Sequence, residues 1–365
     1  MKQVCLQCGR ISAGGDLFCQ ETYCPGEMSP TILDAGDWFG DIEIVKPIIV
    51  LRSAVLYEAT HQKRKVYLKV AHPGAENKER LKREAEFLQS LQLRKLHQQT
   101  LPRLLPAYAN TTVALDAYGK TMLRGHLLYF FLFEHFEGEP LCDVLRRNPQ
   151  LWINHVGWTM TSLAATVNYL HMQSRYHFGL SPDSLLVRFD DKPSAPRTLL
   201  FDLGVVTDKA HLNQDWYPFV APPAYTAPEL IDVDPGQVLP DYRTDVYGLG
   251  MVLYELLVGQ PAFPFKLRGD SEVLKAVIRG QRVTMNRVED VRKVAQIALR
   301  ATSLEPAERQ SSAYEFAQQL RGLFGDVPPP KRSPWPSLNT IFLVVIVLVI
   351  IAFLIVLALT LSSAA

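Results

Sequence analysis

The sequence predicts an α+β protein of two lobes, with a small metal-binding segment at its start and a membrane-spanning helix at its end. Three observations predict this arrangement. Strand-like apolar runs dominate the first third of the chain and helical patterns dominate the remainder, which is typical of α+β proteins with segregated elements. Four of the five cysteines fall within the first 24 residues. No charged residue follows Arg332.

The composition excludes several classes of protein. The 365 residues are enough for two or three domains. Lys plus Arg number 38 and Asp plus Glu number 37. The chain therefore lacks the basic excess of a dedicated nucleic-acid binder, and we expect no nucleic-acid partner. Apolar residues make up 48% and aromatic residues 10%, which excludes a disordered chain.

The cysteine-bearing start, residues 1–29, predicts a zinc-ribbon-like segment. Its thiols follow the spacing Cys-x2-Cys, ten residues, Cys-x4-Cys, at Cys5, Cys8, Cys19 and Cys24. Two close pairs of thiolates supply the four tetrahedral ligands of a structural zinc ion. So short a segment buries little surface, so metal would have to stabilise it. The second spacing is looser than usual, so a disulfide pair or unrelated thiols remain the alternative. Cys142 stands alone and is expected to be a packing residue.

Between the two ends, residues 37–325 carry a series of strand and helix patterns. Strands are expected at 66–70, 127–133, 184–187 and 199–201, and helices at 76–88, 158–172, 245–258 and 288–301. In the first helix the Glu76–Arg80 and Glu79–Arg83 pairs have the favourable i,i+4 order. The patterns predict a strand-rich small lobe, 37–134, followed by a helical large lobe, 139–325.

Motifs on these elements follow the order found in eukaryotic-type Ser/Thr protein kinases, a family that the region 37–325 resembles. Lys69 lies in a Val-x-x-Lys strand, and Glu84 follows fifteen residues later. The series continues with His177-Phe-Gly-Leu-Ser-Pro-Asp-Ser184, Asp202-Leu-Gly204, Ala227-Pro-Glu229, Asp245-Val-Tyr-Gly-Leu-Gly250 and Glu305-Pro-Ala-Glu-Arg309. Each motif is weak alone, but together they are specific. The resemblance implies a two-lobed protein-kinase-like fold.

The resemblance also implies nucleotide roles for three residues. Lys69 would hold the α/β-phosphates of ATP, Glu84 would pair with Lys69, and Asp202 would bind magnesium. The alternative, which we favour, is that Lys69 pairs with the two carboxylates only to neutralise buried charge between the lobes. Binding of ATP and magnesium is therefore left open.

Two departures from the family pattern argue against ordinary ATP binding. The glycine-rich loop of the family has Ile49, Leu51 and Ala54 at its three glycine positions here. Glycine lets the backbone approach phosphate, and side chains as large as Ile and Leu oppose that approach. Tyr67 stands where the family usually has a small Ala above the adenine ring. An aromatic side chain there would fill the nucleotide pocket.

The catalytic loop of the family, H-R-D-x-x-x-x-N, is altered more sharply. Phe178 replaces the Arg, Gly179 the catalytic Asp and Ser184 the magnesium-binding Asn, while Ser181 stands where a Lys is common. Gly179 has no side chain and cannot act as a general base. Ser184 offers a hydroxyl, which is a poorer magnesium ligand than an amide carbonyl. Asp183 is offset by four residues from the position of the base, so we do not expect it to take over that role.

Further matching positions have architectural roles in the family. Asp245 would accept hydrogen bonds from the backbone of the catalytic loop, and Glu229 would pair with Arg309 inside the large lobe. Retention of these residues indicates a retained fold and says nothing of catalysis. Pro222-Pro223 occupies a stretch in which the family often has a substrate-receiving Thr, so ordinary substrate docking is also in doubt.

The uncharged end of the chain predicts a membrane anchor. A helix over 339–361, apolar without a break from Ile341 to Ala358, matches a bilayer core of roughly 30 Å. The Pro-rich juxtamembrane linker, 326–338, precedes it, and its Lys331 and Arg332 favour the cytoplasmic side. No signal-peptide pattern opens the chain. We expect a single-pass membrane protein whose N-terminal bulk is cytoplasmic.

Residues 61–103 are locally basic, with eleven Lys or Arg against four Asp or Glu. Contact with anionic headgroups beside the anchor is one interpretation of this excess. A solvated helix face carrying ion pairs is the simpler interpretation, and the i,i+4 order of the first helix favours it.

The sequence as a whole favours a membrane-anchored, catalytically impaired pseudokinase that acts as a signalling scaffold or regulator and binds a protein partner. The alternative is an atypical active Ser/Thr protein kinase that transfers phosphate from ATP to protein, using Lys69, Glu84 and Asp202 with a substitute base. A third hypothesis is a purely structural adaptor in which the zinc ribbon and the anchor matter most.

Overall fold

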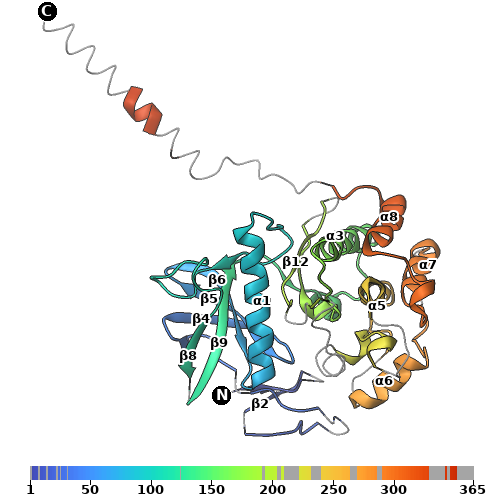
Figure 1. Cartoon of the computed structure of the whole chain (residues 1–365), viewed down its shortest axis with the longest axis horizontal. Coiled ribbons are helices and arrows are strands. Elements are labelled where there is room, and N and C mark those ends of the chain that lie inside the picture. Colours follow the sequence, from blue (N-terminus) through green and yellow to red (C-terminus); the bar gives the residue numbers. More distant parts are fainter. Residues whose placement is uncertain are drawn as a thin grey trace, which may run out of the picture. The chain divides into compact units, whose positions relative to one another are not determined.

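A computed structural model of the chain describes all but the following residues: 1, 7–8, 14, 22–23, 25, 31, 124, 191–193, 204–206, 209–221, 232–239, 264–268, 286–289, 329–341, 343–345 and 352–365. The chain divides into two compact units, Met1–Pro328 and Pro329–Ala365. The first unit holds the sheet and the helices labelled in Figure 1.

The small lobe is built on an antiparallel sheet of seven strands in the order β3-β4-β5-β6-β9-β7, with β8 also paired to β9. The strands are β3 (Trp38–Phe39), β4 (Ile42–Val50), β5 (Ala54–His61), β6 (Arg64–Ala71), β7 (Leu104–Leu105), β8 (Gly119–Leu123) and β9 (His126–Glu134). Alternate residues of a strand point to opposite faces. Val66, Leu68 and Val70 of β6 therefore join one buried cluster. Tyr67 joins the other cluster, which continues into the large lobe.

Helix α1 (Ala75–Leu93) lies beside the sheet and contacts β6 and β9 (Figure 1). Its buried apolar residues, Leu81, Ala85, Leu88 and Leu91, recur at spacings of three and four, which places them on one face of the helix. Glu84 belongs to the same buried face. Packing of the apolar stripe thus carries a carboxylate into the space between the lobes.

The large lobe is mostly helical. Its helices are α2 (Leu141–Arg147), α3 (Ile153–Met172), α5 (Tyr242–Val258), α6 (Asp270–Ile278), α7 (Arg292–Ala301) and α8 (Ala313–Phe324). A three-stranded sheet of β10 (Glu139–Pro140), β11 (Leu185–Arg188) and β12 (Arg197–Leu200) accompanies them. Helix α5 is buried over almost its whole length and contacts α3, α7 and α8. It forms the core around which the other helices pack.

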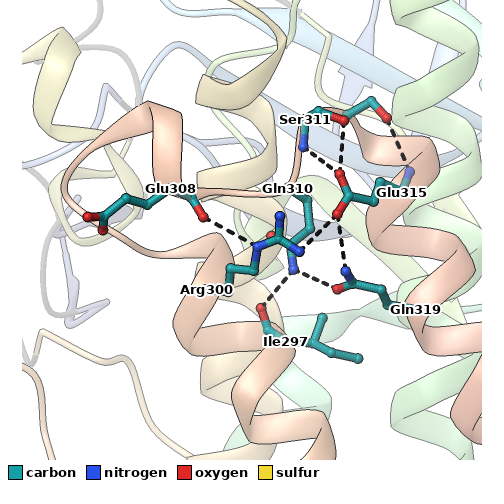
Figure 2. A network of polar contacts seen from close by, with 8 residues as sticks. Ile297, Arg300, Glu308, Gln310, Ser311, Glu315 and Gln319 are labelled. Carbon is teal, nitrogen blue, oxygen red and sulfur yellow. Dashed lines mark hydrogen bonds and ion pairs between the residues drawn. The ribbon is translucent and has the colours of Figure 1, made fainter.

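A polar network joins α7 to α8 (Figure 2). Ser312 caps α8 by accepting the backbone N–H of Glu315 at 3.2 Å. The Glu315 carboxylate also accepts from Ser311 at 2.8 Å and from Arg300 of α7 at 2.9 Å. Burial acts to raise the pKa of Glu315, but these donors outweigh it and hold that pKa below its usual value. The backbone N–H of Glu315 in the first turn of α8 and the Glu315 carboxylate therefore both have hydrogen-bond partners.

The structure confirms the predicted strands and helices in type and shifts some of their ends. Helix α3 begins five residues before the predicted start, and the described part of α7 begins at Arg292 instead of 288. The described ion pairs of α1 differ from the i,i+4 pairs that the sequence favours. Glu79 contacts Lys78 and Lys82, and Arg80, at 5% exposure, turns inward. The buried face of α1 extends to Arg80 because that residue lies one turn before Glu84.

Within the described part of the chain, none of the helices combines the length and the apolarity needed to span a bilayer. The predicted anchor over 339–361 lies outside the described residues, apart from Phe342 and residues 346–351, which are helical.

Candidate functional site

Strand β6, helix α1 and the segment after β12 bring three charged residues together between the lobes. The Lys69 Nζ atom lies 2.5 Å from Glu84 Oε2 and 2.6 Å from Asp202 Oδ1. The backbone N–H of Leu203 donates to the second oxygen of Glu84 at 2.9 Å. Lys69 and Glu84 are each 1% exposed. The three residues named by the sequence motifs therefore form one closed ion cluster, while Gly204 lies outside the described residues.

The charges of this cluster stabilise one another. Burial acts to lower the pKa of Lys69, but Asp202 and Glu84 outweigh it and raise that pKa, so the ammonium stays charged. Burial acts to raise the pKa of Asp202, and Lys69 and Arg80 bring it below its ordinary value. Burial raises the pKa of Glu84 to about 7, against the pull of Lys69. Lys69 therefore favours the ionised form of both carboxylates, and its effect prevails over burial at Asp202.

Arg80 supplies a second buried cation beside this cluster. It is 5% exposed, and its Nε atom has no hydrogen-bond partner among the described residues. Burial lowers the pKa of its guanidinium, while the charges of Asp202 and Glu84 act to raise it. Two cations therefore face two carboxylates, so the residues themselves balance the buried charge.

Tyr67 occupies the position at which the family has a small residue above adenine. It is 1% exposed, and its ring packs against those of Phe133 at 5.3 Å and His135 at 4.9 Å between centroids. Its hydroxyl donates to the backbone carbonyl of Phe136 at 2.9 Å. Phe136 belongs to the segment that joins β9 to β10 and so links the lobes. The phenol ring fills this end of the space between the lobes.

The turn between β4 and β5 replaces the glycine-rich loop. Leu51 is 8% exposed and Ala54 is 2% exposed, so two of the three glycine positions carry buried side chains, and Ile49 packs against the same core cluster. His72 holds the turn: its Nε2 lies 2.9 Å from the Leu51 carbonyl oxygen, and its backbone N–H donates to the Ser53 carbonyl at 2.8 Å. Phosphate would need free backbone N–H groups in this turn, and that of Leu51 donates to the Ala54 carbonyl at 2.8 Å.

An ion pair connects this turn to the large lobe. Arg52 donates two hydrogen bonds to the Asp270 carboxylate, of 2.7 and 3.1 Å. Asp270 lies in the first turn of α6, where a carboxylate is also favoured by the helix dipole. The planar fork of Arg suits such two-point contact. The pair ties the β4–β5 turn to α6 across the two lobes.

The catalytic-loop positions are buried, and Gly179 and Ser184 make hydrogen bonds within the loop. Gly179 donates its N–H to Nδ1 of His177 at 3.2 Å. The Ser184 hydroxyl donates to the Ser181 carbonyl at 2.8 Å and accepts the Ser181 N–H at 3.3 Å. Phe178 has φ 55° and stacks on Tyr176 at 5.1 Å. The hydroxyl of Ser184 is thus committed to a local turn, and the position of the base offers only backbone.

Asp183, which from the sequence is not expected to act as the base, is engaged with a neighbouring thiol. It lies in the short helical turn Pro182–Ser184, and burial raises the pKa of its carboxyl, while a hydrogen bond with Cys142 acts in the opposite direction. Burial also raises the pKa of the Cys142 thiol. Asp183 faces α2, where Cys142 lies, and Cys142 is therefore part of a polar contact as well as of the packing.

The architectural positions match their predicted roles. Asp245 accepts the backbone N–H groups of His177 and Phe178 at 2.9 and 2.7 Å, and its Oδ2 lies 2.8 Å from Nε2 of His171. Arg309, which is 2% exposed, makes a two-point contact with Glu229 at 2.7 and 2.8 Å. The described backbone thus retains the polar framework of the large lobe.

In the N-terminal segment 1–29, three of the four predicted zinc ligands lie together. The Sγ atoms of Cys5, Cys19 and Cys24 are within 4.8 Å of one another. Cys8, the fourth, lies outside the described residues.

Sequence reasoning missed Arg52, Asp270 and Arg80. Arg52 and Asp270 are 218 residues apart, and no motif connects them. Arg80 had a usable signal, because a residue four positions before Glu84 shares its helix face.

The comparison with protein families matches residues 52–322 to the protein kinase domain. The chain is 27% identical over 151 residues to a Drosophila melanogaster serine/threonine-protein kinase, CG17528, covering 41% of this chain and 19% of that protein. It is 26% identical over 144 residues to the Xenopus tropicalis MAP kinase-interacting serine/threonine-protein kinase 1, covering 37% and 34%. The matched part is therefore about a fifth to a third of these relatives' length.

Solved structures show the same fold. The kinase domain of Mycobacterium tuberculosis PknI superposes with a TM-score of 0.51 at 20% identity, covering 80% of this chain and 99% of that domain. A double mutant of that domain gives a TM-score of 0.55 at 18% identity, covering 81% and 100%. The predicted kinase-like α+β fold is confirmed.

Proposed function

The chain belongs to the protein kinase domain family, and we propose that it is a member that has lost phosphotransfer. It acts as a pseudokinase, a membrane-anchored signalling scaffold or regulator that presents its kinase-like surface to a protein partner. The anchor is the apolar stretch 339–361, and the N-terminal bulk is cytoplasmic, as the basic residues of the linker 326–338 favour.

The observation that carries this proposal is the position of Tyr67. Adenine would have to displace a ring that is 1% exposed, together with its hydrogen bond to the Phe136 carbonyl. Exposing such a side chain costs about 1.5–3 kcal/mol, and the hydrogen bond adds about 1 kcal/mol. A total of about 3 kcal/mol lowers nucleotide affinity by about a hundredfold.

Three further observations support loss of catalysis. Gly179 offers no side chain to accept the proton of a substrate hydroxyl. The Ser184 hydroxyl is engaged with Ser181 at 2.8 Å, so binding magnesium would break that turn. Arg80 and Lys69 already balance the charge of Asp202, on which both act, and a metal ion would have to compete with these built-in cations.

A titration with nucleotide and nucleoside tests the role of Tyr67. For the purified full-length chain we expect no rise of the melting temperature with millimolar ATP and magnesium, since only a ligand of the native state stabilises it. Adenosine lacks phosphates and so probes the adenine space alone. We expect adenosine to stabilise Tyr67→Ala and to leave the matched control Tyr67→Phe, which keeps the ring, unchanged. A clear rise for the wild-type chain with ATP would contradict the proposal.

One observation favours the alternative, an atypical active Ser/Thr kinase. The Lys69–Glu84 pair at 2.5 Å is in place, and this pair is required in active kinases. On this alternative ATP with magnesium would raise the melting temperature of the wild-type chain, and Tyr67 would move aside on binding. We favour the pseudokinase because Lys69 also lies 2.6 Å from Asp202. The carboxylate that would bind magnesium is therefore already paired with a cation of the protein.

A further inference from the structure

The described residues of the N-terminal segment 1–29 form no apolar cluster of their own. Its two strands, β1 (Gln3–Val4) and β2 (Ile11–Ser12), have two residues each. Three of its apolar side chains are exposed, namely Ile11 at 62%, Leu17 at 80% and Phe18 at 58%. A segment that buries so little apolar surface needs a cross-link or a metal ion to hold one conformation.

Three thiols meet where this segment folds back on itself. The Sγ atoms of Cys5, Cys19 and Cys24 lie within 4.8 Å of one another, and those of Cys5 and Cys24 are 3.7 Å apart. A disulfide needs about 2.0 Å between its sulfurs, so these two are not joined to each other. Thiolates bound at about 2.3 Å around a tetrahedral zinc ion are about 3.8 Å apart, which agrees with the observed separation.

The backbone around the thiols is arranged as in a ligand turn. The N–H of Gly9 donates to the Cys5 carbonyl at 3.0 Å, and Gly9 has φ 74°, a conformation that glycine adopts without strain. The N–H of Glu21 donates to Cys19 Sγ at 3.4 Å. Hydrogen bonds to a ligating atom orient it and stabilise its charge. The donor set consists of sulfur alone, which suits zinc.

Residues just after the N-terminal segment 1–29 belong to the interior of the small lobe, and one residue of the segment packs against that interior. Ile32 and Leu33 belong to the buried cluster of Phe39 and Ile42, and Val4 packs against it. Val4 and Ser29 exchange hydrogen bonds of 2.9 and 2.8 Å, from the Val4 N–H to the Ser29 hydroxyl and from the Ser29 N–H to the Val4 carbonyl.

Two hydrogen bonds connect the segment to the sheet through the residues that follow it. The Ile32 N–H donates to the Lys2 carbonyl at 2.9 Å. The backbone N–H of Leu33 donates to the hydroxyl of Tyr57 on β5 at 3.2 Å. Because Val4 directly precedes Cys5, a metal ion that fixes Cys5 also fixes the position of Val4 against the small lobe.

We propose that Cys5, Cys19 and Cys24 bind a structural zinc ion that fixes the N-terminal segment onto the small lobe and so stabilises the kinase-like domain. The site is independent of the proposed loss of catalysis and stands on the three described thiols. The zinc ion has a structural role. Because it binds the folded segment and not the unfolded one, its binding free energy adds to the stability of the folded chain. Cys8, which lies outside the described residues, is the fourth ligand that the spacing predicts.

Metal content and spectroscopy test the site itself. The full-length chain, purified from zinc-supplemented cells without chelator, is expected to contain one zinc ion per molecule by plasma mass spectrometry. Replacement by cobalt(II) is expected to give the visible and charge-transfer bands of a tetrahedral thiolate site. No bound metal, a content of iron instead of zinc, or a Cys5–Cys24 disulfide in peptide mapping without reductant would overturn the proposal.

Matched variants test the ligands. Cys19→Ser and Cys24→Ser are each expected to weaken zinc binding at least tenfold and to shift or abolish the cobalt spectrum, and Cys8→Ser is expected to do the same. Cys142→Ser, the control, removes a thiol of the large lobe and is expected to keep the full metal content. Equal loss in Cys142→Ser would overturn the assignment. The cobalt spectrum of the wild-type chain keeps the test decisive if a variant does not fold.

A chelation experiment tests the coupling to the small lobe. A strong zinc chelator is expected to lower the melting temperature of the main unfolding transition, and added zinc is expected to restore it. If the metal leaves with that transition unchanged, the ion does not stabilise the kinase-like domain and this part of the proposal fails.

Discussion

The space between the lobes and the interior of the large lobe both bury charged groups, but they differ in how closely their residues match the family pattern. In the large lobe, Glu229 pairs with Arg309 and Asp245 holds the catalytic-loop backbone as the family pattern implies. Between the lobes, the buried Tyr67 and Gly179 stand where the family pattern has a small residue and the catalytic Asp. The positions that hold the fold are retained. Among those with roles in phosphoryl transfer, Lys69, Glu84 and Asp202 are retained, while Gly179 and Ser184 stand at the positions of the base and of the magnesium-binding Asn.

The difference indicates that the framework residues of the large lobe are needed for stability, whereas the residues with roles in phosphoryl transfer are needed only for catalysis. Removing one partner of a buried ion pair destabilises a protein strongly, so a framework such as Glu229–Arg309 persists as long as the fold is needed. Loss of a catalytic base costs no stability, because Gly179 leaves no buried charge behind. A chain that uses the fold only as a binding surface is free to change the second set.

The largest expected effect comes from breaking the retained framework. Arg309→Met leaves the Glu229 carboxylate buried without its cation, and we expect a loss of about 3–5 kcal/mol in the free energy of unfolding. Denaturant titration of the full-length chain measures it, with exposed Arg292→Met as the surface control. A loss no larger than that of the control would show that the framework is not what holds the large lobe.

A smaller, pH-dependent effect is expected at Glu255 of α5, which bonds the Tyr225 hydroxyl. Burial raises the pKa of Glu255 to about 8, against the pull of that hydroxyl. Between about pH 4.5 and pH 8, Glu255 is therefore protonated in the folded chain and ionised in the unfolded chain. This contribution to stability is fully present below pH 4.5 and is lost as the pH rises toward 8.

Replacing Glu255 by Gln removes this pH dependence of the free energy of unfolding. We expect the free energy of unfolding of the wild-type chain to fall by about 2–4 kcal/mol more than that of Glu255→Gln between pH 5 and pH 8.5. Urea titrations at both pH values measure it, with exposed Glu305→Gln as the control. Identical pH dependence of wild type and Glu255→Gln would contradict the buried, protonated state.

The smallest effect is expected at the ion pair that ties the lobes. Because Asp270 is 40% exposed in its side chain, Arg52→Asp or Asp270→Arg alone should cost about 1 kcal/mol or less. The double exchange, with both charges reversed, should recover most of the loss, and high salt should reduce the differences. Failure of the exchange to recover stability would show that the pair does not act as a unit.

The fold and the charged centre of the site were predictable from short motifs, because Lys69, Glu84, Asp202, Asp245 and Glu229–Arg309 lie at fixed places in the family pattern. The replacements at Tyr67 and Gly179 were readable for the same reason.

The contacts that close the site were not predictable. The acceptor of the Tyr67 hydroxyl is the backbone carbonyl of Phe136, 69 residues away, and a carbonyl leaves no mark in a sequence. Arg52 and Asp270 meet only through the packing of two lobes. Arg80 was taken for a surface residue because its charge pattern outweighed its helical phase.

Phosphate transfer tests the central claim most directly. The full-length chain is incubated with ATP, magnesium or manganese, and generic protein substrates, and the incorporated phosphate is compared with that of Asp202→Asn. Since the base position is Gly179 and Tyr67 fills the adenine space, we expect wild type and Asp202→Asn to give the same background. Incorporation by the wild-type chain that Asp202→Asn abolishes would show an active kinase and contradict this account.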